Sequence, residues 1–332
     1  MRELLEKLLL PIAPSGSEGQ AVCAIKDMIK DHVDEMHVDA MGSLIAVKKG
    51  QPGGKRIMLS AHMDHIGYVV TAIEAEGFLR VMPLGGVALN TERRHLIFPS
   101  GVHGIISAQP LRGGEGLATK HLFIDIGAQD RHEAEAMVSV GDCAVLAGNS
   151  FSLGAHRIAA PAMDDRCACA LLVKALLTLE KPVNTIIAVF SSQEEIGCRG
   201  ARVAAYAGEP DIGLALDVTG WGDTPETKDV NVYLGAGAAI KIMDRGSISS
   251  PLVRDALIAC AVETGAPYQR EVLPYGGTDA SAMQAARGGM YVGTLSIPCR
   301  YVHSAMEVID MRDMEAALTI LNAFIRRDFS AC

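Results

Sequence analysis

The chain has 332 residues, 49% of them hydrophobic, and a formal net charge of −9 at pH 7. This length allows a full hydrophobic core and predicts two domains. The acidic balance and the lack of a long basic run argue against a nucleic-acid partner. No uninterrupted apolar run approaches the ~20 residues of a membrane span, so we expect no membrane partner either.

The N-terminal residues predict a short helix rather than a targeting signal. Arg2, Glu3, Glu6 and Lys7 interrupt the first apolar stretch and give it an amphipathic pattern. Eight cysteines are scattered without the regular spacing of a disulfide framework, which predicts free structural thiols in a reducing compartment. We therefore expect a cytoplasmic protein.

The first catalytic candidates follow a predicted helix and an apolar strand. Ser17 and Gln20 suggest a capping box for a helix that runs to about His32. The later run 56–62 has the pattern of a strand that delivers His62, with Asp64 two residues beyond it. Neutral imidazole is the commonest side-chain ligand for zinc-like ions, and a nearby carboxylate can hold its second nitrogen. These residues predict a metal ligand, His62, oriented by Asp64.

The next segment, residues 69–154, has its own character because Gly and Pro break it into short strands. The predicted strands are Tyr68–Ile73, Phe78–Met82, Leu96–Phe98, Gly104–Ser107, His121–Ile126 and Cys143–Ala147. Short strands separated by turn signals indicate a small β-barrel or sandwich. The interval from His62 to Asp164 far exceeds the ~30 residues of a crossover connection, so an inserted domain fits there. The alternative is that this segment is a plain surface elaboration of the main domain.

Two acidic motifs follow the insertion. Asp164 lies at the junction between an apolar run and a helical pattern over 167–179, where its two carboxylate oxygens can bridge two cations. The apolar run 184–193 ends in Glu194 and Glu195. The side chains of successive residues in extended backbone point to opposite sides, so one Glu can bind metal while the other faces the water that attacks the substrate.

The last two candidate ligands again follow apolar runs. Asp217 ends the run from Ile212, and His303 follows Arg300. Helical periodicity marks 251–264 and 312–327. Strands that alternate with helices predict a mixed or parallel sheet covered on both faces, and ligands at the carboxyl ends of strands suit the crevice of such a sheet.

Each polar residue alone has a simpler explanation. Asp217 could cap a helix, Glu194 and Glu195 could form a solvated turn, and His303 could be a satisfied core histidine. It is much less plausible that all six positions, His62, Asp164, Glu194, Glu195, Asp217 and His303, have separate structural explanations. Three carboxylates and two imidazoles suit a pair of borderline divalent ions such as zinc, cobalt or manganese, and not calcium or a thiolate zinc site.

The order His, Asp, Glu-Glu, Asp, His resembles the co-catalytic metallopeptidases, and the local motifs resemble the tetrahedral, glutamyl and deblocking aminopeptidases, a cellulase-M-like family. The resemblance extends from about Pro14 to about Leu321. The matching motifs are Ala61-His62-Met63-Asp64, Met163-Asp164-Asp165-Arg166, Gln193-Glu194-Glu195-Ile196-Gly197, Gly276-Gly277-Thr278-Asp279-Ala280, Arg300-Tyr301-Val302-His303-Ser304 and Glu307-Val308-Ile309-Asp310.

This resemblance implies an α/β fold with a mixed, mostly parallel sheet flanked by helices and an inserted small β-barrel. It implies a catalytic metallopeptidase domain at 1–68 and 155–332 and a barrel dimerisation domain at 69–154. It further implies two divalent ions per subunit, zinc foremost, and a homo-oligomer between a dimer and a tetrahedral dodecamer that hydrolyses short peptides. The implied metal ligands are His62, Asp164, Glu195, Asp217 and His303, with Glu194 as the general base and Asp64 as the catalytic partner of His62.

One position departs from the family pattern. Members commonly carry an acidic residue directly after the Asp of the first motif, whereas this chain has His65. A second imidazole there would reduce the negative charge near the metals.

Two other classes of function stay open from the sequence. A glycoside hydrolase could use Glu194 with Asp217 or another carboxylate as its acid pair and would not require His62 or His303. A non-catalytic assembly protein could use the barrel for subunit contacts and bind metal only structurally.

Overall fold

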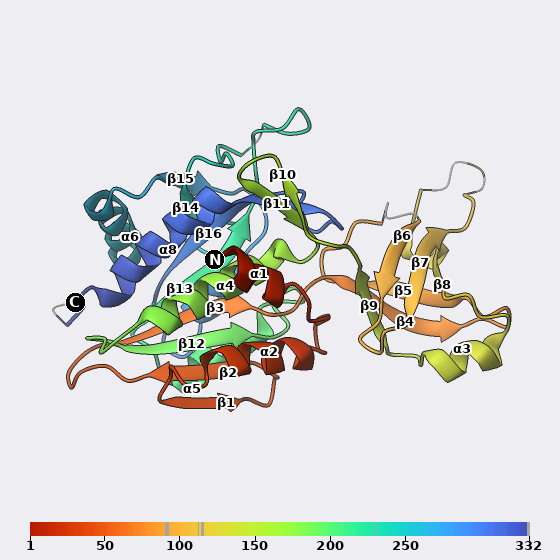
Figure 1. Cartoon of the computed structure of the whole chain (residues 1–332), viewed down its shortest axis with the longest axis horizontal. Helices are drawn as coiled ribbons and strands as arrows, with labels where there is room; N and C mark the ends of the chain where they lie inside the picture. The colour runs from red at the N-terminus through yellow and green to blue at the C-terminus, as the bar shows by residue number, and fades with distance from the viewer. Residues whose placement is uncertain (90–92, 112, 114–115, 229, 331–332) are drawn as a thin grey trace.

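The computed structural model describes residues 1–89, 93–111, 113, 116–228 and 230–330. Figure 1 shows a large layered body, which holds both chain termini, and a barrel at the other end of the long axis. None of the helices in the described part of the chain combines the length and apolar character needed to cross a bilayer.

The layered body is built on a mixed sheet. In spatial order its main strands are β1 (Glu35–Val38), β2 (Leu44–Lys48), β12 (Thr185–Ser191), β3 (Arg56–His62), β13 (Ile212–Thr219), β16 (Tyr291–Arg300), β17 (Glu307–Asp310), β11 (Arg157–Ala160) and β10 (Phe151–Leu153). β14 (Ala238–Met243) pairs with β16 and with β15 (Tyr268–Val272). The central strands β12, β3, β13 and β16 run parallel, so their carboxyl ends meet at one edge. The strands toward both ends of the main path are antiparallel.

Helices cover the two faces of this sheet. The helices are α1 (Arg2–Leu8), α2 (Gly19–Ile29), α4 (Met163–Thr178), α5 (Arg199–Gly208), α6 (Pro251–Thr264), α7 (Asp279–Gln284) and α8 (Met311–Arg326). Side chains alternate along β3, so Ile57 and Leu59 join the core beneath α1, α2, α4, α6 and α8, whereas Met58 packs with α5 and α7. Helix α4 is buried along most of its length, as expected for a helix that is apolar on nearly every side.

The barrel closes in the order β4 (Gly67–Ile73), β5 (Leu79–Leu84), β8 (Leu122–Asp125), β7 (His103–Ala108), β6 (Arg94–Ile97) and β9 (Cys143–Leu146). It has its own core, which includes Tyr68, Phe98 and Ile124. All six strands expected in this segment are present, within a few residues of their predicted bounds. A short 3-10 turn, Thr119–His121, precedes β8, and helix α3 (Arg131–Met137) packs on the outside.

The predicted fold class is confirmed: a mixed sheet, parallel at its centre, lies between helices, and a small closed β-barrel is inserted between β3 and α4. The predicted division at residues 69 and 154 stays a prediction. The barrel strands extend from Gly67 to Leu146, while Phe151–Leu153 pairs with β11 in the large sheet.

The predicted capping box at Ser17 and Gln20 is wrong. Helix α2 begins at Gly19 after Glu18, whose side chain makes no capping bond to the helix. The Gln20 side chain instead accepts a hydrogen bond from the Ile12 N–H at 3.0 Å, and Glu18 accepts from Gly16 and from Gln193 at the edge of the candidate site. The Gln20 side chain that the local pattern assigned to the helix end therefore binds another part of the chain, and Glu18 instead of Ser17 precedes the helix.

Candidate active site

The sequence-predicted site residues converge at the carboxyl edge of the central strands. His62 ends β3, Glu194 and Glu195 follow β12, Asp217 lies near the end of β13, and His303 follows β16. Parallel strands bring such positions together because their carboxyl ends share one edge of the sheet. Asp164 reaches the same place from the start of α4.

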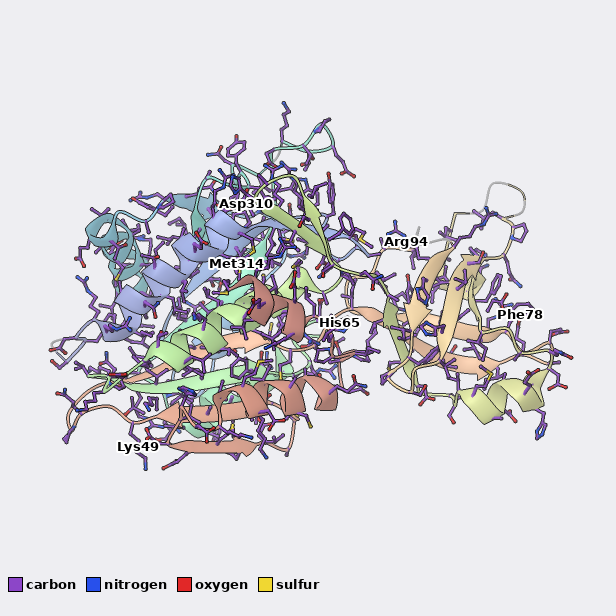
Figure 2. All side chains as sticks on the ribbon, in the orientation of Figure 1. Lys49, His65, Phe78, Arg94, Asp310 and Met314 are labelled. Atoms are coloured by element: carbon purple, nitrogen blue, oxygen red, sulfur yellow. The ribbon has the colours of Figure 1, made fainter. Side chains whose placement is uncertain are left out.

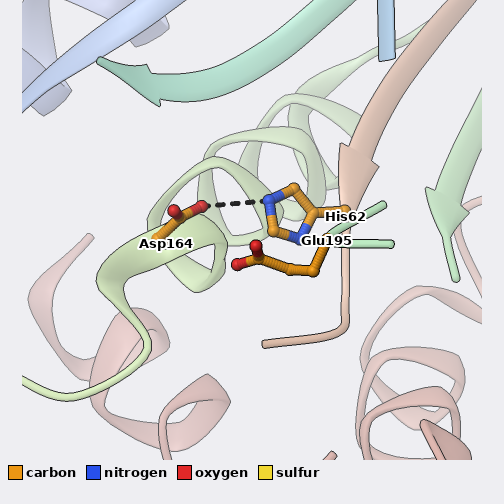
Figure 3. A group of neighbouring side chains, drawn as sticks. All are labelled: His62, Asp164 and Glu195. Carbon is orange, nitrogen blue, oxygen red and sulfur yellow. Dashed lines mark hydrogen bonds and ion pairs between the residues drawn. The ribbon is translucent and has the colours of Figure 1, made fainter. Parts of the chain in front are cut away.

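Asp164 lies between the two histidines. Its Oδ1 is 3.0 Å from His62 Nε2 and its Oδ2 is 3.3 Å from His303 Nε2. Figure 3 shows the Asp164 carboxylate facing the His62 ring, with Glu195 beside both. Each oxygen of one carboxylate therefore faces a different imidazole, as expected of a ligand shared by two cations.

The remaining predicted ligands divide between the two histidines. Glu195 Oε2 is 3.1 Å from His303 Nε2, and Asp217 Oδ1 is 3.9 Å from His62 Nε2. Ligand atoms of His62, Asp164 and Glu195 all lie within 4.8 Å of one another. The five residues therefore form one connected cluster of imidazoles and carboxylates.

The Asp64 side chain holds the Glu194-Glu195 turn. Its Oδ1 accepts from the Glu194 N–H at 2.9 Å, and its Oδ2 accepts from the Glu195 N–H at 3.2 Å and from the Ser15 hydroxyl at 2.6 Å. The His62 Nδ1 lies 2.9 Å from the Asp64 backbone carbonyl and 3.6 Å from its carboxylate. Residue 64 thus orients His62 mainly through its main chain and positions the acidic pair through its side chain.

Three residues with no predicted role complete the surroundings. Glu307, at the start of β17, accepts from the N–H groups of Asp164 and His303 at 2.9 and 2.7 Å. Buried Asp165 accepts from the His62 N–H and joins His62 and Asp217 in a group that could hold an ion. Buried Asp279 lies near Glu194. All three occur in the motifs that carry the resemblance, but only spatial contacts distinguish them from structural acids.

The segments that deliver these side chains have unusual backbone angles. Gln193, Cys198, Tyr301 and His303 have φ values of 55°, 51°, 61° and 64°, in the left-handed region that L-residues with side chains seldom occupy. Asp164 and Asp165 lie at the start of α4 with non-helical angles. Such conformations concentrate at functional sites, where surrounding contacts hold them.

Burial and crowding leave the cluster with an excess of negative charge. Burial lowers the pKa of His303, but the Asp164 and Glu195 carboxylates outweigh that effect and raise the pKa to about 12. Burial, with the charges of Asp217 and Asp279, holds the pKa of Glu194 well above its ordinary value although His62 opposes the shift. The site therefore favours positive charge among its carboxylates.

The donor set fits divalent cations. Imidazole nitrogens and carboxylate oxygens are the ligands of zinc and its borderline neighbours. The buried Glu195 Oε1 and Asp165 Oδ1 have no hydrogen-bond partner in the described structure. Buried carboxylate oxygens without partners are costly, and a cation bound in this cluster would satisfy them.

A cavity of about 580 Å³ opens over the cluster, within the usual range for small-molecule sites. Its lining includes His62, Asp164, Glu194, Asp217 and His303. Apolar and aromatic groups, among them Trp221, Leu273, Tyr275 and Val302, also line it. An adjoining cavity of about 430 Å³ also includes Trp221, Val302 and His303 in its lining.

Comparisons with known proteins agree with this geometry. The family model described as M42 glutamyl aminopeptidase matches residues 42–320. The lysyl aminopeptidase of Pyrococcus furiosus is 36% identical, with 97% of this chain and 96% of that one covered. The structure of an aminopeptidase from the archaeon Desulfurococcus kamchatkensis superposes with a TM-score of 0.93 at 38% identity, covering 98% of this chain and 94% of that one. The Pyrococcus horikoshii TET1 peptidase, which can assemble into a tetrahedron or a large octahedral shell, gives 0.88 at 32% identity and 98% coverage of both chains.

Proposed function

The chain belongs to the M42 glutamyl aminopeptidase family and is therefore an aminopeptidase, and we propose that it removes N-terminal residues from short peptides. In this proposal the protein binds two divalent ions at its active site. The observation that carries the two-ion proposal is the position of Asp164, whose two oxygens face two different histidines.

The contacts support a division of the ligands. His62 and Asp217 would hold one ion, His303 and Glu195 the other, and Asp164 both. Two divalent cations supply positive charge that polarises the scissile carbonyl and lowers the pKa of the attacking water. Zinc fits this donor set best, and cobalt or manganese are the alternatives.

Glu194 is suited to move the proton. Its Oε1 accepts from the Cys198 thiol at 3.1 Å, and its Oε2 lies 3.9 Å from His62 Nε2 on the cavity side. Asp64 fixes the main chain of Glu194, so the carboxylate is held over the cluster. Glu194 would take the proton of the attacking water and give it to the leaving amine.

The two adjoining cavities support a peptide substrate. The larger one has room for an N-terminal side chain beside the catalytic cluster, and the second offers space for the residues that follow. His303 lines both, so a peptide that spans them would place its first amide bond near the cluster.

The decisive test combines chelation with substrate screening. Aminoacyl anilides, short peptides and a soluble β-glucan are incubated with the untreated, chelated, and zinc-, cobalt- or manganese-reloaded protein, and bound metal is measured. We expect peptide hydrolysis that chelation abolishes and metal restores. Chelation-resistant glucan cleavage would favour a glycoside hydrolase, and metal binding without any hydrolysis would favour an assembly protein.

We also propose that the protein is a homo-oligomer, at least a dimer, in the cytoplasm. The barrel exposes Met82, Ile105 and Val140, apolar groups of the kind that subunit contacts bury. The TET1 relative can assemble into a tetrahedron or a large octahedral shell. Free thiols in the described part of the chain suit a reducing compartment. Light scattering tests the assembly, and a monomeric protein would refute this proposal.

A further inference from the structure

A thiol lies beside the proposed general base. Cys198, the residue before α5, lines the main cavity and donates from Sγ to Glu194 Oε1 at 3.1 Å. The Ser281 hydroxyl approaches the same sulfur at 3.8 Å. The proposed hydrolysis gives this thiol no task, and no thiol belongs to the predicted metal ligands.

A buried carboxylate completes the group. Asp279, 2% exposed, accepts from the Ser60 and Ser191 hydroxyls at 2.6 and 2.5 Å, both through Oδ2. Its Oδ1 has no hydrogen-bond partner in the described part of the chain. One ligand atom each from Glu194, Cys198 and Asp279 lie within 4.8 Å of one another.

We propose that Glu194, Cys198 and Asp279 form a third, inhibitory cation site that selects thiophilic divalent ions such as zinc and cadmium. The inference rests on Glu194 as the base of the proposed peptidase. An ion held there would make the Glu194 carboxylate a ligand, so that it could no longer accept a proton from water. The thiolate selects zinc or cadmium over manganese and magnesium, which prefer oxygen ligands.

The site should fill only after the two catalytic positions. Its thiol must lose a proton to bind metal, and burial, together with the charges of Glu194 and Asp279, raises the pKa of Cys198. The two catalytic positions use imidazoles and carboxylates and need no thiolate. Peptide hydrolysis should therefore pass through a maximum as zinc is added.

The test adds cadmium to the two-ion protein and follows two signals. One is hydrolysis of an aminoacyl anilide, relative to each variant's own two-ion activity. The other is the ultraviolet charge-transfer absorbance of a cadmium–thiolate bond, to which the predicted catalytic ligands cannot contribute. We expect inhibition and absorbance to rise together, and manganese in the same excess to produce neither.

Matched variants separate this site from other thiols. Cys198→Ser should remove the absorbance and raise the half-inhibiting cadmium concentration at least ~10-fold, since even outer partners of metal ligands contribute 10- to 100-fold in affinity. Cys23→Ser, at an exposed thiol, should behave like the parent protein. Equal inhibition of the parent and Cys198→Ser, or an unchanged absorbance in that variant, would overturn the proposal.

Equilibrium dialysis decides the question if Cys198→Ser loses activity. We expect three tightly bound cadmium ions in the parent, two in Cys198→Ser, and a weakened third ion in Asp279→Asn, which keeps the side-chain shape. Two ions in all three proteins would refute the site. A protein that hydrolyses no peptide would refute the proposed function instead, because absorbance and dialysis report the third ion independently of turnover.

Discussion

At the scale of single residues, Glu194 separates chemistry from metal binding. Glu194→Gln keeps the side-chain shape and removes the proton acceptor, so turnover should fall by ~10² or more. The two catalytic ions should remain, because the bridging contacts belong to Asp164, His62 and His303. Steady-state kinetics with metal analysis on the same preparation checks this. Loss of both ions together with activity would instead identify Glu194 as a ligand.

His65, the departure from the family pattern, is a structural residue in this protein. It is buried, and its Nε2 accepts from the Ala13 N–H at 3.2 Å. Burial, then the charge of Arg166, lowers the pKa of His65 to about 3. The side chain is therefore neutral at pH 7 and does not add positive charge to the site. Figure 2 shows its position on the side of the layered body that faces the barrel.

This neutral histidine predicts a pH-dependent stability. Between its ordinary pKa of 6.5 and its folded pKa of about 3, the unfolded chain binds a proton that the folded protein does not, so stability falls as the pH drops through that window. His65→Gln keeps a hydrogen-bond acceptor and cannot titrate. From pH 7.5 to 5, the parent should lose up to about 2 kcal/mol more unfolding free energy than this variant. Urea unfolding at both pH values measures the difference, and parallel losses would contradict it.

At the scale of elements, the strands that deliver the site could be predicted from the sequence. Apolar runs that end in a polar residue identified β3, β12 and β13, and parallel pairing explains why their ends meet. The start of α4 at Met163 could not be predicted in this way, because Asp164 and Asp165 have non-helical angles and precede the helical pattern over 167–179. The role of the Asp64 side chain at the Glu194 turn was also hidden, since main-chain contacts leave no periodic signal.

The Arg166 side chain connects α4 to the end of α1 and to the segment that follows β3. Fully buried in α4, it donates from Nε to the Met63 carbonyl at 2.9 Å and from Nη1 to the Leu8 carbonyl at 2.8 Å. These bonds connect the end of α1 and the segment after β3 to the helix that carries Asp164. A lysine cannot satisfy both carbonyls in the same geometry.

We expect Arg166→Lys to reduce the unfolding free energy by on the order of 2 to 4 kcal/mol, because each unpaired buried carbonyl costs ~1–3 kcal/mol. Urea unfolding of the metal-free protein measures this without a contribution from bound ions. Arg202→Lys, at an exposed position of α5, makes the same change and should shift stability by less than ~0.5 kcal/mol. Equal effects of the two substitutions would show that Arg166 is not a structural connection.

At the scale of the whole molecule, the barrel contributes to the active site as well as to the surface. Its segment after β5 brings Gly85 and Gly86 against Glu195 and His303. Gly86 also lines the main cavity. The sequence indicated a barrel and a catalytic layer but not this contact, because a glycine pair between strands is read locally as a turn signal. Only the folded arrangement shows that the insertion limits the space around His303.

Because of this contact, we predict that adding one methyl group at Gly86 impairs catalysis, although Gly86 lies far from the catalytic residues along the sequence. A Cβ at Gly86 would lie 2.4 Å from His303 Nδ1, too close for the ring to keep its position. Gly86→Ala should therefore move the His303 imidazole and weaken the binding of one of the two ions. We expect kcat/KM to fall by ~10², the loss that a misplacement of about 1 Å can cause. Gly116→Ala is the control, since the added Cβ has none of the described residues within 4 Å. Kinetics, metal titration and light scattering on both variants measure activity, binding and assembly. If Gly86→Ala keeps full activity and both ions, or loses activity only because it dissociates, the barrel does not shape the site through this glycine.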